Sequence, residues 1–491
     1  MTMQSGRILT ATTTAALHRH VPPGARLVLG LSGGSDSVVL FHVLLDLQAS
    51  HSFHLACVHV HHGLSLHADA WADFCRNLCA MHHIPLTVHR VNIARDDPAG
   101  IEAAARTGRH HIFAATEADF VLTAHHRDDQ AETFLLQLLR GAGPKGLAAM
   151  AEMQHRSGWK AALLRPLLSV ARADIRAYAE VRGLEWVEDE SNLDRNYRRN
   201  DLRHTIMPRV AERFPGYSAT LARAAALQAD AAELLQDLAK LDAADAVTGE
   251  CLDCAVLARL SRPRARNLLR HFIGQYAPIL SHEETPAFSP QAGGRGCSAI
   301  VPGDTPSDKS ATTPHYGLKP DKVRMPSERR LNQALHQLIT ARQDARVCVN
   351  LGSVELLRFR GGAYLAPPRT HSVQASVAWH GEVVLHLETL GVKVEFMSTR
   401  GSGLKRATLE AGRVVLGVRQ GGEHMRMIAG GPRRSLKNLL QEFALPPWRR
   451  DHLPLLWCDG RLVWAAGIGF DADYLAQAEE PGLILACSML G

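Results

Sequence analysis

The chain has few cysteines and no long hydrophobic run. Its nine cysteines in 491 residues lack the density and the regular spacing of a disulfide scaffold. That scarcity excludes a small disulfide-stapled fold and favours a reducing compartment. No stretch reaches the roughly 20 apolar residues that a membrane span needs, and the start of the chain lacks the apolar core and cleavage site of a signal peptide. We therefore expect a cytoplasmic protein without membrane association.

Composition and length are those of an ordinary soluble protein with several domains. Hydrophobic residues make up 46% of the chain and charged residues 21%, which is enough apolar material for large cores. The formal net charge of +6 is mildly basic, so a nucleic-acid partner is compatible with the composition without being demonstrated by it. Length alone predicts roughly three domains.

One turn lacks a lysine that many phosphate-binding loops carry. The apolar run 27–31 leads into six residues that precede another apolar run, namely Ser32, Gly33, Gly34, Ser35, Asp36 and Ser37. A strand, a small-residue turn and a helix N-terminus in this order form a phosphate cradle. Without Gly-Lys-Ser/Thr it is not a kinase or GTPase loop. Asp36 repels a polyphosphate unless a cation lies between them, so we expect a nucleotide with Mg²⁺ at Asp36; the alternative is an ordinary strand-to-helix corner.

Strand-like and helical patterns alternate along the first two hundred residues. Apolar strand patterns at 53–60, 86–91 and 120–124 are separated by helical patterns at 68–81 and 101–116, and a further helix is expected at 128–139. This alternation predicts an α/β fold, a doubly wound parallel sheet with helices on both faces. Ligands of such sheets bind where the carboxyl ends of the strands converge.

The loops at those strand ends carry candidate catalytic residues. His125, Asp129 and Glu132 follow i, i+4, i+7 spacing and share one face of a helix. One imidazole and two carboxylates can hold Mg²⁺ or an ammonium substrate, although acidic residues in a first helical turn also favour the helix dipole. Arg106 and Arg109 lie three residues apart and can clamp phosphate oxygens; a solvated arginine pair is the alternative.

Together these segments resemble the tRNA(Ile)-lysidine synthetases, a branch of the ATP pyrophosphatases. The resemblance rests on the loop at 32–37, His-x-His-His-Gly-Leu at 59–64, Ala-Ala-Arg at 104–106, Ala-His-His-x-Asp-Asp-Gln-x-Glu-Thr at 124–133, and Asp-x-Ser-Asn with Arg-Asn-x-Leu-Arg-His inside 188–208. The last pair of motifs separates the lysidine branch from its relatives. His110 stands where the family usually has tyrosine and His61 where it usually has asparagine, and we assign no role to them or to His62.

The resemblance implies ATP-dependent ligation of free L-lysine to C2 of the wobble cytidine in the CAU anticodon of a minor tRNA(Ile). The cytidine would first be adenylated, and the lysidine formed would change codon reading from AUG to AUA and identity from Met to Ile. Asp129 and Glu132 would hold the lysine, and His125 would transfer a proton or orient the substrate. Arg106, Arg109 and Arg203 would offset the charge that develops on the phosphates. The implied catalytic residues are Asp36, Arg106, His125, Asp129, Glu132 and Arg203.

The rest of the chain divides into two further parts. Helical patterns at 218–246 and 252–275 precede a stretch rich in Ser, Pro, Gly and Thr, and short strand patterns dominate from about residue 373. We expect an adenylation domain at 1–215, a mostly helical substrate- and tRNA-binding domain at 216–370 and a small α+β tRNA-binding domain at 373–491. The Ser- and Pro-rich segment at 278–326 has the composition of a disordered insert.

Basic residues cluster in two of these parts. A charge run is usually a solvated face, but one cluster adjoins the predicted nucleotide site, so we expect contacts with RNA phosphates. A homodimer is compatible with the sequence, which does not determine the oligomeric state. The residues expected to bind tRNA are Arg195, Arg198, Arg199, Arg433, Arg434, Lys437, Arg449 and Arg450.

Three alternative functions can be weighed from the residues. Cys251-x-x-Cys254 would fit a tRNA thiolase, which shares the adenylation step. Cys254 falls in an apolar series with Leu257 and Leu260, however, and no second C-x-x-C completes a four-thiolate site, so core packing is favoured. A non-catalytic RNA-binding protein conflicts with the intact set of acidic residues and histidine. A glutamine-fed amidotransferase would need an N-terminal cysteine nucleophile, which Met1-Thr2 does not supply.

Overall fold

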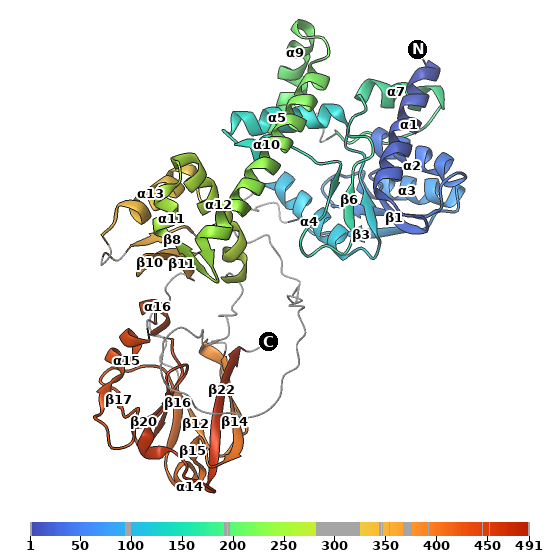
Figure 1. The fold of residues 1–491 in the computed structure, drawn as a ribbon. Helices are drawn as coiled ribbons and strands as arrows, with labels where there is room; N and C mark the ends of the chain where they lie inside the picture. Colours follow the sequence, from blue (N-terminus) through green and yellow to red (C-terminus); the bar gives the residue numbers. More distant parts are fainter. Residues whose placement is uncertain are drawn as a thin grey trace. The chain divides into compact units, whose positions relative to one another are not determined.

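The computed structural model describes residues 2–93, 100–190, 194, 197–280, 325–342, 345, 347–352, 354–366, 376–390, 392–443, 445–450 and 452–489. The chain forms two compact units, and the boundary between them falls between Asp237 and Leu238. Figure 1 shows both units coloured along the sequence. The predicted insert at 278–326 lies outside the described residues from 281 to 324, and the three-domain division stays a prediction.

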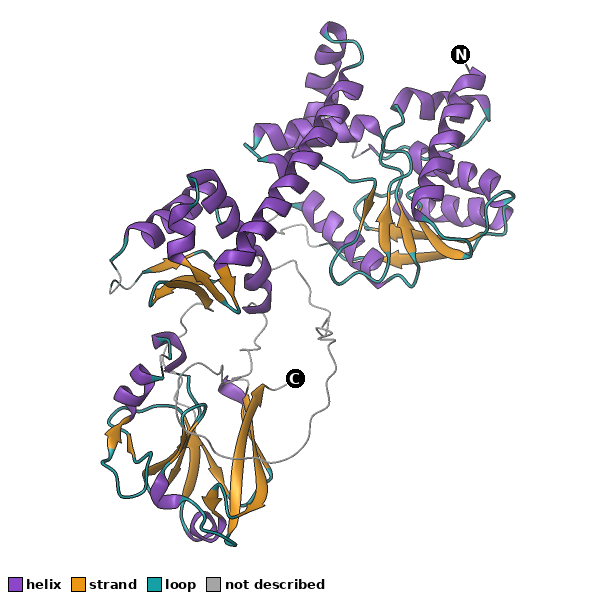
Figure 2. Cartoon of the chain, viewed as in Figure 1, coloured by secondary structure: helices purple, strands orange, loops and turns teal. Residues whose placement is uncertain are grey.

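A six-stranded sheet forms the centre of the first unit (Figure 2). Its strand order is β3-β2-β1-β4-β6-β5, and all neighbours are parallel except the edge strand β5, which runs antiparallel to β6. The predicted parallel α/β sheet is confirmed. The strands are β1 (Ala25–Gly30), β2 (Phe53–His61), β3 (Leu86–Arg90), β4 (Phe120–Leu122), β5 (Met153–Gln154) and β6 (Ala162–Leu164).

Helices cover both faces of this sheet because successive side chains of a strand point to opposite faces. Leu27 and Leu29 of β1 pack into a core formed with α1 (Thr2–His20), α2 (Ser35–Gln48), α3 (Ala68–Met81) and α7 (Arg172–Val181). Val28 lies between them in the chain and packs into the opposite core, where α4 (Ile101–Ala115) contributes Phe113. The loops that follow the parallel strands all lie at the carboxyl edge of the sheet.

Further helices follow β4 and β6 in the first unit. They are α5 (Arg127–Leu139), α6 (Pro144–Leu147), α8 (Arg198–Asp201), a π-helical turn (Leu202–Ile206) and α9 (Met207–Arg213). The long helix α10 (Tyr217–Ala246) contains the boundary between the units.

The second unit begins with helices packed on a small antiparallel sheet. The sheet order is β7-β8-β11-β10-β9, with β7 (Val247–Thr248), β8 (Cys251–Asp253), β9 (Cys348–Asn350), β10 (Glu355–Phe359) and β11 (Gly362–Ala366). The helices are α11 (Cys254–Arg259), α12 (Arg262–Leu280) and α13 (Glu328–Thr340). The helical pattern expected at 252–275 is thus two helices that follow a short strand, because Asp253 caps α11 and the helix ends at Arg259.

Two antiparallel sheets form the rest of the second unit, and the α+β class expected there is confirmed. One sheet joins β12 (Ser376–Trp379), β16 (Val414–Gly417), β19 (Leu455–Cys458), β20 (Arg461–Ala465) and β21 (Gly469–Phe470). The other joins β13 (Val384–Leu387), β14 (Val392–Arg400), β22 (Pro481–Met489) and β15 (Leu404–Lys405). The remaining elements are a ribbon of β17 (His424–Met425) and β18 (Arg434–Ser435), helices α14 (Arg406–Ala411), α15 (Leu436–Glu442) and α16 (Pro447–Arg450), and 3₁₀ turns at Glu388–Leu390 and Ala472–Tyr474.

Within the described part of the chain, no helix is both long and apolar enough to cross a bilayer.

Gly30 tests how closely α4 packs on the sheet. A Cβ atom at this last residue of β1 would lie 2.8 Å from Cζ of Phe113. We expect Gly30→Ala to lower the free energy of unfolding by about 1–3 kcal/mol, because overpacking forces a neighbouring side chain to shift. Urea denaturation measures the change. The double variant Gly30→Ala, Phe113→Leu should regain part of the loss, and an unaltered stability of Gly30→Ala would contradict this packing.

Candidate active site

The turn between β1 and α2 presents free backbone donors at the carboxyl edge of the sheet. Gly34 is the N-cap of α2, in an extended conformation, and no side chain of the described residues caps the helix there. The first N–H groups of a helix have no intrahelical acceptor, and they favour phosphate oxygens. Gly33 has a φ of +88°, and a Cβ on it would lie 2.8 Å from Cγ2 of Val187. A side chain at this position would be strained by the positive φ and would contact Val187, so the position suits glycine.

Hydrogen bonds hold the loop in this shape before any ligand arrives. The hydroxyl oxygens of Ser32 and Ser37 lie 3.0 Å apart, and Ser32 also accepts from the N–H of Gly34 at 3.3 Å. Ser37 donates to the carbonyl of Gly34 at 2.9 Å. From outside the loop, the N–H of Val187 donates to the carbonyl of Gly33 at 3.0 Å. These contacts hold the loop in one conformation, which suits the predicted phosphate cradle.

His126 connects this loop to α5. Its Nδ1 accepts from the N–H of Asp129 at 3.3 Å, and its own N–H donates to Oδ2 of Asp129 at 3.1 Å, which makes a reciprocal cap. Its Nε2 lies 3.6 Å from Oδ2 of Asp36 and 3.4 Å from Oδ2 of Asp129. Burial opposes the charged ring, but the hydrogen bond to Asp36 and the nearby carboxylates prevail and raise the pKa of His126. The histidine thus bridges the metal-binding candidate Asp36 and the carboxylates of α5.

Asp129 and Glu132 lie on the buried face of α5 and bind two arginines. Arg199 donates from Nε to Glu132 at 3.0 Å and from a terminal nitrogen to Asp129 at 2.9 Å. Arg203 donates from Nε to Glu132 at 2.6 Å and from a terminal nitrogen to Asp129 at 2.9 Å. Asp129 is 8% exposed and Glu132 3% exposed. Two carboxylates and two guanidiniums therefore balance their charges inside the protein, as buried ions must. We call these four residues the ion-pair cluster.

The charges around Asp129 keep its carboxylate ionised. Burial alone would raise the pKa of Asp129, but His126, Arg199, His125 and Arg203 outweigh it and hold the pKa below its usual range. The cluster therefore offers ionised oxygens to any cation that can replace a guanidinium.

His125 lies beside the cluster as a neutral imidazole. Its Nδ1 is 2.9 Å from the hydroxyl of Thr123. Burial, opposed by Asp129 but aided by Arg165 and Arg109, lowers the pKa of His125 to about 3. The expected helical face shared by His125, Asp129 and Glu132 is wrong for His125, because α5 begins at Arg127 with His126 as its N-cap and His125 precedes both. The charge of Asp129 still acts on the imidazole of His125.

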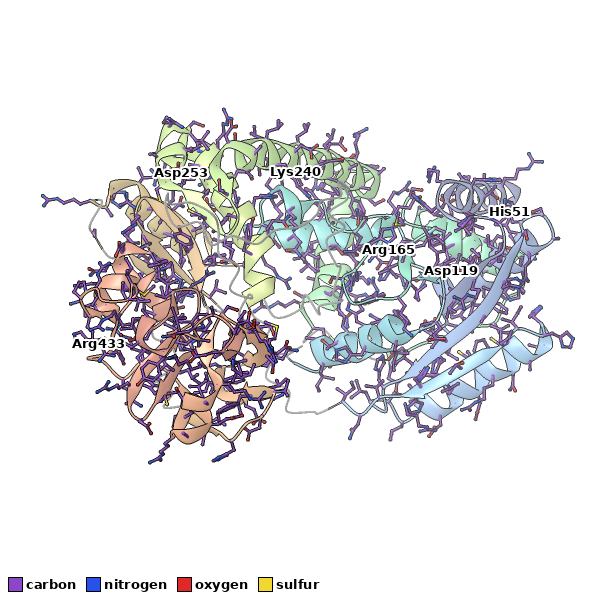
Figure 3. The ribbon with its side chains drawn as sticks, turned by 60° about the horizontal axis from the view of Figure 1, so that its bottom comes forward. His51, Asp119, Arg165, Lys240, Asp253 and Arg433 are labelled. Carbon is purple, nitrogen blue, oxygen red and sulfur yellow. The ribbon has the colours of Figure 1, made fainter. Side chains whose placement is uncertain are left out.

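Four guanidiniums act on His110 of α4. Burial and the charges of Arg156, Arg106, Arg109 and Arg165 lower the pKa of His110 to about 3. Arg109 also lowers the pKa of His125, so its charge reaches the site, whereas the charge of Arg106 acts on His110. Arg165 follows β6 directly and is labelled in Figure 3. The position of His110 among the guanidiniums keeps it uncharged.

Burial, together with Arg109 and the neighbouring histidines, lowers the pKa of His62 to about 4. His61 is also buried, with Nε2 3.2 Å from Oδ1 of Asp69. His61 is the last residue of β2 and His62 follows it, and both remain without an assigned role.

Our sequence reasoning missed Arg165, Arg156 and His126. A signal existed for His126, since a residue at the start of a helix with Asp three positions later forms a cap. A weaker sequence signal existed for Arg165, because it follows the apolar run 161–164. That run contains the short buried strand β6. Arg156 follows the two-residue strand β5, which is too short to be recognised from a pattern.

A magnesium ion fits the donor set at Asp36. Among the described residues, no group of three or more carboxylate, imidazole or thiol side chains forms a metal site. Mg²⁺ needs no such cage, because it takes most of its oxygen ligands from substrate phosphates and water and one or two from carboxylates. Asp36, whose side chain is 32% exposed beside the loop, is suited to that part.

The residues expected to bind tRNA lie in both units. Arg198 and Arg199 belong to α8 of the first unit, and Arg195 lies outside the described residues. In the second unit the four expected arginines have partners within the same unit. Arg433 lies 3.2 Å from Asp471 and Arg434 lies 2.6 Å from Glu442. Arg449 forms an ion pair with Glu250, and Arg450 donates to the carbonyl of Leu445 at 2.8 Å. Lys437 is exposed on α15, and Figure 3 marks Arg433. Their contact with tRNA stays a prediction.

The two cysteines of the C-x-x-C pattern belong to the packing of the second unit. Cys254 is 3% exposed in the core with Leu257, and burial raises the pKa of its thiol to about 11. Burial also raises the pKa of Cys251. Neither thiol has the lowered pKa of a reactive or metal-binding cysteine, which favours the packing interpretation over sulfur chemistry.

Family models match three stretches of the chain. Residues 9–210 match the PP-loop domain, residues 316–364 the TilS substrate binding domain and residues 414–487 the TilS substrate C-terminal domain. Among solved structures, the U34-tRNA thiolase NcsA from Methanococcus maripaludis is 17% identical with a TM-score of 0.41, covering 45% of this chain and 79% of that chain. A TilS C-terminal domain is 20% identical with a TM-score of 0.19, covering 24% of this chain and 98% of that chain.

Curated relatives match almost the whole sequence. The tRNA(Ile)-lysidine synthase of Nitrosomonas europaea is 38% identical over 472 residues, covering 96% of this chain and 93% of that protein. The tRNA(Ile)-lysidine synthase of Azoarcus sp. is 39% identical over 471 residues, covering 95% of this chain and 92% of that protein. With the preformed phosphate loop, this similarity shows that the chain is an ATP-using ligase and belongs to the tRNA(Ile)-lysidine synthase family.

Proposed function

We propose that the enzyme ligates free L-lysine to C2 of the wobble cytidine in the CAU anticodon of tRNA(Ile), converting ATP to AMP and diphosphate. The observation that carries the proposal is that one edge of the sheet brings a preformed phosphate loop next to a buried pair of carboxylates. The loop suits adenylation, and the carboxylates suit a substrate with an ammonium group. The product would read AUA in place of AUG and carry isoleucine identity.

Adenylation would take place at the loop between β1 and α2. The carbonyl oxygen of the cytidine attacks the α-phosphorus of ATP, an O–P bond forms, and the bond to the β-phosphate breaks to release diphosphate. The N–H groups that begin α2 bind phosphate oxygens, while Arg106 and Arg109 offset the negative charge that develops. Mg²⁺ held by Asp36 would neutralise part of that charge when bound.

Ligation would follow at the same edge. The side-chain amine of lysine, having lost its proton, attacks C2 of the cytidine; a C–N bond forms and the C–O bond to AMP breaks. Asp129 and Glu132 would bind the α-ammonium group, which leaves the side-chain amine free to react. An ammonium forms the same charge-assisted hydrogen bonds that the guanidiniums of Arg199 and Arg203 form in this structure.

Lysine binding would therefore release a guanidinium from the ion-pair cluster. The oxygens of an RNA phosphate are the natural new partner for a released arginine. This exchange reconciles the tRNA-binding role expected for Arg199 with its observed contacts to Asp129 and Glu132.

His125 is better suited to orient lysine than to deprotonate it. A general base works best with a pKa near the working pH, whereas burial and the nearby arginines lower the pKa of His125 to about 3. We therefore assign it a hydrogen bond to the substrate as the main role.

The reaction itself is tested by incorporation of labelled lysine into purified tRNA(Ile) with a CAU anticodon, with ATP and Mg²⁺ present and labelled sulfide in parallel. Lysine uptake with equimolar AMP is the expected result. Sulfur transfer without lysine uptake would place the enzyme with the thiolases, and uptake of neither would refute ligation.

Asp36→Ala should abolish adenylation and leave tRNA affinity nearly unchanged, because Asp36 lies at the phosphate loop. We expect a fall of at least about 100-fold in diphosphate release, the usual size for loss of an electrostatic transition-state contact. Asp46→Ala is the control, since Asp46 is on the same helix but binds the hydroxyl of Tyr178 at 3.2 Å, away from the loop. Full activity of Asp36→Ala would contradict the assignment.

Asp129→Asn should raise the KM for lysine about 10- to 100-fold, since a hydrogen bond to a charged group contributes about 1.5–3 kcal/mol. The rate of diphosphate release in the adenylation step should change by a smaller factor than the KM for lysine. The control is Asp128→Asn, whose carboxylate accepts the N–H of Arg172 at 2.9 Å and lies outside the ion-pair cluster. Equal KM values for the two variants would show that lysine binds elsewhere.

A further inference from the structure

Arg165 is a buried cation whose observed partners are neutral. Arg165 is the first residue after β6 in the chain, and it is 3% exposed. One terminal nitrogen donates to the carbonyl of Ala151 at 2.7 Å and the other to the side-chain oxygen of Gln154 at 3.4 Å. Its Nε is buried without a hydrogen-bond partner in the part of the chain that the structure describes. None of these described partners is a carboxylate.

Such an arrangement is costly in the free protein. An ion that loses its hydration without a counter-charge is destabilising by several kcal/mol, and buried polar groups in folded proteins ordinarily have partners. Among the described residues the guanidinium of Arg165 therefore has no anionic partner, and a ligand can supply one.

The surroundings of Arg165 add positive charge. Arg156 donates from Nε to the same Gln154 oxygen at 3.3 Å, so one amide oxygen serves two guanidiniums. A terminal nitrogen of Arg156 lies 3.2 Å from Nδ1 of His110, and its guanidinium lies over the ring of Trp159 at 5.0 Å. His110 and Trp159 form an edge-to-face pair with ring centroids 5.7 Å apart. The group combines an anion-binding fork with an aromatic surface.

The position of Arg165 separates it from the phosphate loop. The loop follows β1, Arg165 follows β6, and β4 lies between these two strands. At 4.7–4.9 Å between neighbouring strands, two strand spacings amount to roughly 10 Å. His125 follows the intervening strand β4, beside the proposed lysine site. An anion at Arg165 is therefore held apart from a phosphate in the loop.

We propose that Arg165 and Arg156 form a second phosphate-binding subsite, and that it takes a phosphodiester group of the tRNA next to the target nucleotide. This proposal rests on the function proposed above. Guanidinium forks match phosphate oxygens in geometry as well as charge. An aromatic surface next to them suits an unstacked RNA base, which favours RNA over a free nucleotide as the source of the phosphate.

The test uses Arg165→Met in the full-length protein, which replaces the buried charge with an apolar chain. Binding of the anticodon stem-loop of tRNA(Ile) is measured at several salt concentrations, and ATP binding is measured separately. We expect the slope of log affinity against log salt to lose about 0.7–0.9 in magnitude, the effect of one phosphate contact. ATP affinity should stay unchanged. The melting temperature of the free variant should equal or exceed that of the wild type, because an uncompensated charge is gone.

Lys160→Gln is the matched control. It removes the same charge at the opposite end of β6, where Lys160 binds Glu117 at 2.6 Å on the exposed surface, and its salt slope should match the wild type. Arg156→Gln is a second variant in case Arg165→Met fails to fold, and it should flatten the slope in the same direction.

Three results would overturn the proposal. Equal salt slopes for wild type, Arg165→Met and Arg156→Gln would show that no RNA phosphate binds there. A loss of ATP affinity with an unaltered RNA slope would assign the phosphate to the nucleotide. Failure of the wild type to bind the stem-loop at all would instead refute the proposed tRNA substrate, and this subsite with it.

Discussion

The carboxyl edge of the sheet depends on the ion-pair cluster of Asp129, Glu132, Arg199 and Arg203. Two buried carboxylates on α5 would be destabilising alone, and two guanidiniums from a segment about seventy residues later neutralise them. Their pairing joins α5 to α8 and the π-helical turn. Because the cap between Asp129 and His126 places His126 near Asp36, the same cluster also orients the side chains beside the phosphate loop.

Groups that favour anions and groups that favour cations lie at separate positions along this edge, an arrangement that suits both a phosphate and an ammonium substrate. Helix N–H groups after β1 and guanidiniums from α4 favour phosphates, whereas the carboxylates of α5 favour an ammonium group. His125 lies between these environments and is kept neutral by burial and by the arginines. In the proposed reaction the phosphate-binding groups take part first, when the cytidine is adenylated. The carboxylates take part second, when the amine of lysine attacks the same cytidine. In that proposal, exchange within the ion-pair cluster would give the second step a cation site that an arginine occupies until lysine binds.

Local patterns predicted the parts of the site that are continuous in sequence. The small-residue loop lies on one strand-turn-helix unit, and Asp129 and Glu132 lie on α5 as their spacing predicts. The same spacing placed His125 on the helix, whereas the helix begins only after His126. Pairings between distant segments had no such signal. In the sequence Arg199 belongs to a basic run with no sign of its partner. Its hydrogen bond to Glu132 forms only because the fold brings the two distant segments together. Arg165 follows the three-residue strand β6. That β6 lies next to β4 depends on the order of strands in the sheet, which local sequence patterns do not determine. The same holds in the second unit, where β8 pairs with β11 across a long stretch of chain.

Lysine binding by the free enzyme tests the account most directly. Calorimetry without tRNA or ATP would compare the wild type with Arg199→Gln, which removes one of the two guanidiniums that occupy the carboxylates. Arg198→Gln, which removes the same charge one residue earlier on α8, is the control. We expect Arg199→Gln to bind lysine more tightly than the other two proteins, because the competing cation is gone. Equal or weaker binding by Arg199→Gln would contradict a lysine site at Asp129 and Glu132.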